Sequence, residues 1–353
     1  MGKKRTDIEL MRIIACFFVI FNHTQNQGFF LFSTYASTDL RFWIYMMISV
    51  FCVFAVPMFF TITGALMLNR EPEPLKKLWI NRIGKIFIAL LFWSLFYYFD
   101  EIYMGWETLG VKDFLQVFYT SNWNAALWYL YAYIPLLMTL PILQKMVKNI
   151  TDKEFIYMFG LVMLFSMVIP VGQYLLWRDK YIINGYFNVN WMTTNIFLYP
   201  CLGYFLNYRL EEFWTKKKLV FMWMINIASM MLTCWLTYME AERTGVLEEN
   251  SQRFIGMFVM LNCIAVFATC QYIFRKCAIP VWIEKLICSV GSCTFGIYLL
   301  HIFFKGRVQT VQKLWDIFNI RWGLNDMLSA FLYCGVVFVL GYISTLIIKR
   351  IPL

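Results

Sequence analysis

The chain has 353 residues and a net charge of +10, with 61% apolar, 20% aromatic and only 15% charged residues. Soluble domains carry about 25% charged residues, so a soluble protein of this composition could not cover its surface with polar groups. Intrinsic disorder, nucleic-acid binding and a secreted disulfide scaffold are excluded or made remote. The remaining class is a polytopic membrane protein, with one membrane-embedded domain over residues 1–353.

The ten cysteines lie mostly within apolar runs, and the sequence contains no Cys-x-x-Cys pair. This pattern favours small buried hydrophobic side chains over a redox or metal site, so we expect no metal. The chain also lacks a signal-peptide pattern ending in a small-residue cleavage site. We therefore expect the first apolar run to be a retained helix.

Ten apolar stretches approach the length that an α-helix needs to cross about 30 Å of hydrocarbon. They are too long for single strands and lack strict alternation, so the sequence predicts an all-α fold. The least regular stretch contains Pro200 and Gly203 and is short. In chain order, the ten predicted spans are 8–27, 43–68, 84–104, 125–146, 154–176, 191–208, 219–239, 254–274, 286–304 and 328–348.

The basic residues indicate the orientation of these helices, because cytoplasmic loops carry an excess of Lys and Arg. With a cytoplasmic N-terminus, the inner segments and helix ends hold 19 of the 31 basic residues, and the outer segments hold 10. The other two, Arg12 and Lys85, lie deeper within predicted helices. An even number of spans then places both termini in the cytoplasm, and the net charge needs no nucleic-acid partner.

Three outer segments carry patterns of their own. Residues 111–120 place apolar side chains at helical spacing, which predicts a short interfacial helix. Residues 240–253 are polar, so we expect an exposed connector. Residues 305–323 show another amphipathic pattern, expected to lie on the surface.

Ionisable residues within membrane helices are costly unless they are satisfied, so they are the most informative residues of such a chain. The sequence has two histidines, His23 and His301. At 1.5 Å per residue they lie about 22 and about 24 Å from the inner ends of their helices, so we expect both at similar depth, toward the outer leaflet. An interfacial histidine bound to a backbone group remains the alternative for each.

Three cations lie near the inner ends of predicted helices. Arg12 precedes His23 by about three helical turns, so the two side chains share one face of the first helix, about 16 Å apart. Arg82 and Lys85 are also spaced to share a helix face. The three cations could converge on one anionic ligand. Snorkelling of Arg12 and ordinary positive-inside anchoring of the other two remain open.

Six segments in chain order resemble the acyltransferase 3 family of integral membrane O-acyltransferases, in its bacterial branch that modifies surface polysaccharides. Lys85 stands where the family's Arg-x-x-Arg pair has its second arginine, which keeps the charge but loses bidentate geometry toward phosphate. The segments are IELMRIIACFFVIFNH, VPMFFTITGALML, NRIGKIFIALLFWS, ALWYLYAYIPLLMTLPIL, LYPCLGYFL and TFGIYLLH.

The resemblance implies that an acyl group, usually acetyl, moves from cytoplasmic acyl-CoA to a hydroxyl of an extracytoplasmic glycan or lipid-linked sugar, at the bacterial cell membrane. Arg12, Arg82 and Lys85 would bind the CoA phosphates. His23 would act as general base or carry the acyl group itself, with Arg12 and His301 also in the catalytic set. His301 would orient the acceptor or share proton transfer. The candidate oxyanion donors are Trp128, Tyr298 and Thr63.

A transporter or flippase for a small substrate or lipid-linked saccharide is the main alternative. Ten helices with a few buried ionisable groups fit that class as well, although no inverted repeat or pair of matching broken helices supports it. A structural membrane subunit is a third interpretation. The acceptor, the acyl group and the oligomeric state stay open at this point.

Overall fold

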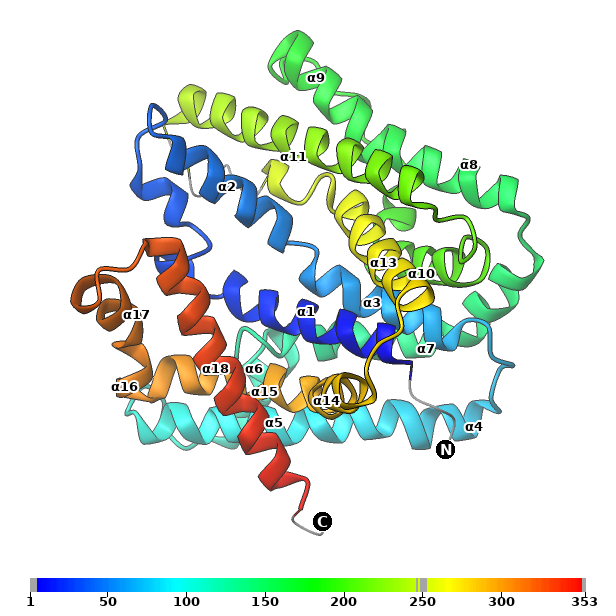
Figure 1. Cartoon of the computed structure of the whole chain (residues 1–353). Helices are drawn as coiled ribbons and strands as arrows, with labels where there is room; N and C mark the ends of the chain where they lie inside the picture. The colour runs from blue at the N-terminus through cyan, green and yellow to red at the C-terminus, as the bar shows by residue number, and fades with distance from the viewer. Residues whose placement is uncertain (1–4, 246, 248–252, 351–353) are drawn as a thin grey trace.

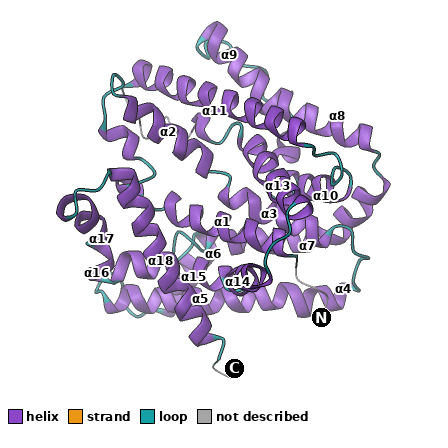
Figure 2. Ribbon diagram, viewed as in Figure 1, coloured by secondary structure: helices purple, strands orange, loops and turns teal. Residues whose placement is uncertain are grey.

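The structure is a computed structural model that describes residues 5–245, 247 and 253–350. Every regular element in these residues is helical, which confirms the all-α prediction (Figure 1; Figure 2). Eight of the ten cysteines are buried, as expected for small hydrophobic side chains.

The helices follow one another along the described residues, and the long connections 23–39 and 178–197 contain only 3-10 turns. The longer ones are α1 (Thr6–Asn22), α2 (Leu40–Cys52), α3 (Ala55–Met67), α5 (Gly84–Tyr103), α7 (Trp128–Asn149), α8 (Asp152–Met163), α10 (Leu198–Tyr208), α11 (Lys216–Thr244), α13 (Val259–Lys276), α14 (Val281–Gly291), α15 (Thr294–Arg307) and α18 (Asp326–Ile348). The shorter ones are α4 (Leu75–Leu78), α6 (Val111–Thr120), α9 (Ile169–Trp177), α16 (Gln309–Gln312), α17 (Leu314–Asp316), the π-helical turns η3 (Trp79–Ile83), η4 (Leu164–Val168) and η6 (Ile317–Arg321), and the 3-10 turns η1 (Gln25–Gln27), η2 (Leu31–Thr34) and η5 (Asn190–Thr193).

In the described part of the chain, six helical runs are long and apolar enough to cross a membrane. They are Leu40–Met67, Leu75–Tyr103, Trp128–Asn149, Asp152–Trp177, Lys216–Thr244 and Asp326–Ile348. The pair α14 and α15 adds a seventh if it counts as one span, but it is bent by 57°. The span predicted over 286–304 thus corresponds to a bent pair of helices rather than to one straight helix. The helices α1, α10 and α13 occupy the other predicted spans.

Helix α1 is the centre of the bundle and packs against α3, α13, α14, α15 and α18 (Figure 1). In the view of Figure 1, α5 runs along one edge of the molecule, and α8 and α9 lie at the opposite edge. A central α1 matters for function, because it places Arg12 and its neighbours inside the protein rather than against lipid.

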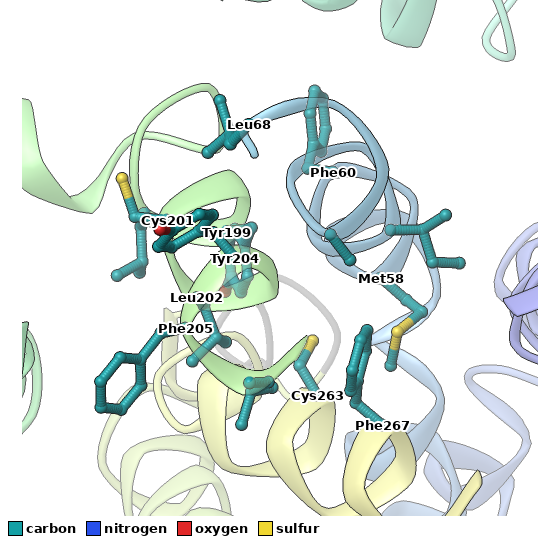
Figure 3. Close-up of a cluster of buried hydrophobic side chains, with 14 of the residues drawn as sticks. Met58, Phe60, Leu68, Tyr199, Cys201, Leu202, Tyr204, Phe205, Cys263 and Phe267 are labelled. Atoms are coloured by element: carbon teal, nitrogen blue, oxygen red, sulfur yellow. The ribbon is translucent and has the colours of Figure 1, made fainter. Parts of the chain in front are cut away.

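Helices α3 and α10 approach backbone to backbone. A Cβ atom added to Gly64 would lie 1.9 Å from the carbonyl oxygen of Pro200, and one added to Gly203 would lie 1.8 Å from that of Thr61. Only glycine fits at such distances, and small residues of this kind let membrane helices associate closely. Figure 3 shows side chains buried around this contact, among them Met58 and Phe60 of α3, Leu202 and Phe205 of α10, and Cys263 and Phe267 of α13.

The three segments 111–120, 240–253 and 305–323 differ in how well their sequence patterns predict their structure. Helix α6 covers Val111–Thr120, which confirms the short helix predicted there. The prediction of a connector over 240–253 is wrong at its start, because α11 continues to Thr244 and Glu240 is buried in ion pairs with Arg243 and Arg253. Residues 246 and 248–252 of that segment, and Lys3 and Lys4 at the start of the chain, lie outside the described residues.

The segment 305–323 is less superficial than its pattern indicates. It forms the end of α15, then α16, α17 and η6. Val311 and Phe318 are buried within it, so its apolar face packs on the protein core.

Candidate active site

A cavity of about 290 Å³ lies beside the N-terminal half of α1. Arg12 is the one residue with a charged side chain among the described residues that line the cavity. The remainder of the wall comes from α3, α5, α7 and the break between α14 and α15, including Thr63, Tyr129, Tyr133 and Tyr298. The wall is therefore apolar and aromatic, with hydroxyl groups and a single cation.

The two histidines meet beyond this cavity. His23 follows the last residue of α1, and its ring centroid lies 5.2 Å from that of His301 on α15, with an angle of 41° between the rings. His301 is fully buried, and His23 is half-buried. The two imidazoles are in contact, at the same level along their helices, as the helix rise predicts.

The hydrogen bond of His301 fixes its tautomer. Its Nδ1 atom lies 2.5 Å from the carbonyl oxygen of Tyr298. A carbonyl oxygen only accepts, so in the neutral ring Nδ1 carries the proton and Nε2 carries the lone pair. This Nε2 atom is buried and has no hydrogen-bond partner among the described residues. It is a free proton acceptor beside a second imidazole.

Tyr298 connects the cavity with the histidine pair. Its side chain lines the cavity, and its ring centroid lies 5.7 Å from that of His301. Neither histidine is among the lining residues, so the open space ends about one helical turn short of the pair. Arg12 and Tyr298 both line the cavity, and His23 contacts His301 on α15, so α1 and α15 contribute to both places.

The three predicted cations do not converge on one point. Arg12 Nη1 donates to Glu9 Oε1 at 2.9 Å, and Arg82 is paired with Glu73. Lys85 is exposed, lines neither the cavity nor the small hollow around Arg82, and makes no ion pair with a described residue. Arg82 lies in the π-helical turn η3, which is wider than the α-helix assumed in the prediction.

Arg12 and Arg82 nevertheless flank one side chain. Tyr133 lines the cavity, and its phenol interacts electrostatically with both arginines. Two cations therefore lie near the part of the cavity wall that Tyr133 forms. The resulting order along the protein is cations, apolar cavity and imidazole pair.

Of the three candidate oxyanion donors, Thr63 and Tyr298 line the cavity and Trp128 does not. The Thr63 hydroxyl donates to the carbonyl oxygen of Phe59 at 2.9 Å, and the Tyr298 hydroxyl donates to that of Ala126. Both hydroxyl protons are thus committed to backbone carbonyls. An oxyanion would have to compete with those bonds.

Sequence reasoning did not identify Tyr129, Tyr133 or Lys305. The two tyrosines are spaced i and i+4 on α7, with ring centroids 5.5 Å apart, which is a readable signal of one shared face. Lys305 lies one turn beyond His301 and interacts electrostatically with both imidazoles. The described residues contain no group of three or more His, Cys, Asp or Glu side chains that could hold a metal ion.

The family model described as an acyltransferase domain, of the acyltransferase 3 family, matches residues 5–346. The chain belongs to the acyltransferase 3 family. It is accordingly a membrane acyltransferase, and the match covers all the helices that build the cavity and the histidine pair. Neither a search of curated proteins nor a search of solved structures finds a match to this acyltransferase.

Proposed function

We propose that this acyltransferase moves an acyl group, with acetyl as the usual one, from cytoplasmic acyl-CoA to a hydroxyl of an extracytoplasmic glycan or lipid-linked sugar. The observation that carries the proposal is the contact between His23 and His301, beyond a cavity that Arg12 lines. The phosphates of acyl-CoA need cations near them. The hydroxyl that attacks its thioester needs a proton acceptor farther along.

The cavity suits one part of acyl-CoA. Its volume of about 290 Å³ is at the lower limit of ligand pockets, which span about 300–1,000 Å³. It fits the narrow pantetheine arm better than the whole molecule. The nucleotide would then remain at the Arg12 and Arg82 end, where charge-assisted bonds to phosphate are strong. Lys85 would contribute through long-range attraction, because its side chain is exposed.

The reaction needs one proton acceptor near the thioester. The acceptor hydroxyl oxygen attacks the thioester carbonyl carbon while its proton passes to His23. The carbon–sulfur bond then breaks, and His23 returns the proton to the CoA thiolate. His301 supports this step because its free Nε2 atom can accept an N–H bond from His23 and stabilise the charged ring. Acyl transfer through His23 itself would use the same pair.

We also propose ten spans, a cytoplasmic location of both termini and a bacterial cytoplasmic membrane. Glu9 in the first turn of α1 packs against Gly291, and Lys349 after α18 binds the carbonyl oxygen of Ser292 at 2.7 Å. The first helix thus begins where the last one ends, which an even number of spans produces. The excess of basic residues assigned to that side supports a cytoplasmic location.

The test is mass spectrometry of envelope glycans from cells that produce the protein, lack it, or carry His23→Ala. The proposal predicts an acyl modification that is present only with the wild-type protein, while His23→Ala accumulates normally in the membrane. Identical glycans in all three strains would contradict it. Substrate flux into vesicles without acyl-CoA would instead support transport.

A further inference from the structure

A second hollow, of about 420 Å³, opens where α11 begins and α13 ends. Three cations line it, namely Lys216, Arg275 and Lys276, and Glu212 is the one carboxylate among its described lining residues. Neither lysine forms an ion pair with a described residue. The hollow is separate from the Arg12 cavity and shares no lining residue with it.

A buried donor without a partner also faces this region. Trp214 lines the hollow and is only 5% exposed, yet its indole N–H has no hydrogen-bond partner among the described residues. An indole N–H can only donate, so it requires an acceptor that this part of the chain does not provide. This indicates a ligand that carries a hydrogen-bond acceptor, independently of the lysines.

The start of α11 adds further donors. The side chain of Thr215 accepts a bond from the Lys218 amide at 3.4 Å, which leaves the amides of the first two helical residues without intrahelical partners. Helix α11 has 29 residues, and the positive end of a long helix favours phosphate. The hollow therefore combines cationic, indole and backbone donors.

Arg275 gives the hollow a fixed wall. Its guanidinium donates to the carbonyl oxygens of Glu211 and Trp214, which ties the end of α13 to the loop before α11. Because Arg275 is held in this way, the site does not depend on flexible surface lysines alone.

We propose that this hollow binds the phosphate of an anionic phospholipid. Helix α11 is long and apolar enough to cross a membrane, so its first turn lies at a membrane surface. Exposed apolar side chains stand beside the hollow, Phe213 before α11, Val220 on α11 and Ile273 on α13, where acyl chains would run. Basic pockets between helices at a membrane surface bind lipid headgroups in this manner. The proposal does not depend on the acyltransferase reaction.

The test uses the full-length protein in nanodiscs of phosphatidylcholine, with or without phosphatidylglycerol, and in phosphatidylcholine with inorganic phosphate. Thermal unfolding midpoints and the lipid retained in native mass spectrometry are measured. Lys216→Gln and Lys276→Gln should each weaken phosphatidylglycerol binding by about fivefold. Trp214→Phe removes the indole N–H but keeps an aromatic ring, so this variant should also weaken phosphatidylglycerol binding. It provides the test if the lysine variants fold poorly. Lys217→Gln is the matched control, because Lys217 is exposed on the same turn but does not line the hollow.

The proposal is supported if phosphatidylglycerol raises the midpoint of the wild type and Lys217→Gln but not of the hollow-lining variants. It is overturned if Lys217→Gln loses as much lipid as Lys216→Gln, because general surface charge would then explain the binding. It is also overturned if inorganic phosphate alone stabilises the wild type as much as the lipid does, since the site would then take free phosphate.

Discussion

The role of His301 can be tested by two substitutions that separate its two ring nitrogens. In His301→Asn the amide nitrogen can take the place of Nδ1 and donate to the Tyr298 carbonyl, which now lies 2.5 Å from Nδ1. The variant lacks a group at the Nε2 position. His301→Gln is the complement, because its longer side chain can place an acceptor near Nε2 but cannot take up a proton.

The expected size of the effect follows from the unpartnered state of Nε2. A positioned proton-transfer group contributes about 10²–10⁴-fold to a rate. We therefore expect kcat of His301→Asn to fall by about 10²–10⁴-fold, with His301→Gln less impaired. The KM for acyl-CoA should change by less than about twofold, because Arg12 binds the donor about three helical turns away.

The assay is the initial rate of label transfer from acetyl-CoA to the native glycan acceptor, with the amount of folded protein measured by size-exclusion chromatography. A His301→Asn protein with wild-type kcat would refute the assignment of Nε2 as a proton acceptor. A loss of folded protein in both variants, restored by neither, would assign His301 to packing instead.

Three further predictions concern the cations and the helix contacts. Arg82→Gln should raise the KM for acyl-CoA by about tenfold at low salt and by less at high salt. The control Lys77→Gln, at an exposed lysine, should leave this KM unchanged. If Arg82→Gln and the wild type have equal KM values, Arg82 serves only as a membrane anchor. Gly203→Ala should lower the free energy of unfolding by about 1–3 kcal/mol. Gly160→Ala should not lower it, because a Cβ atom at Gly160 would meet nothing within 4 Å. Equal unfolding midpoints of the two variants would contradict the close contact of α3 and α10. The Arg82 guanidinium, by hydrogen bonding, holds the pKa of Glu73 below its usual value near 4.5. The stabilisation from this pair is therefore complete above that pH and lost as the pH falls through the lower folded-state pKa, so acid titration of the unfolding midpoint should narrow the gap between wild type and Glu73→Gln.

The equal level of the two histidines along their helices could be predicted from sequence, because it depends only on helix direction and a constant rise per residue. His23 and His301 lie on helices that were expected to run the same way, and their rings are in contact. The tautomer of His301 could not be predicted, because it depends on the position of a single carbonyl oxygen at Tyr298.

The surroundings of the cations were harder to predict. The pairing of Arg12 with Glu9 has a readable i, i+3 spacing, yet Glu9 also fits the start of a helix on electrostatic grounds. The pairing of Arg82 with Glu73 crosses a turn and enters a π-helical segment, for which no periodicity in the sequence gives a signal. The position of Lys85 relative to Arg82 depends on that same segment.

The helix boundaries show a similar division. Long apolar runs such as Asp326–Ile348 and the amphipathic segment Val111–Thr120 are set by local composition, so they could be predicted closely. The bend of 57° between α14 and α15 depends on packing, because Gly291 at that break is pressed against Glu9 of α1. A continuous apolar run gives no sign of such a contact.

A cryo-EM structure of the full-length protein with a non-hydrolysable acetyl-CoA analogue tests the proposed reaction path most directly. We predict density for the pantetheine arm in the cavity lined by Thr63 and Tyr298, with the phosphates toward Arg12 and Arg82 and the acetyl group beside His23. Density for the analogue at another surface, with this cavity empty and His23 remote from the acetyl group, would contradict the proposed path.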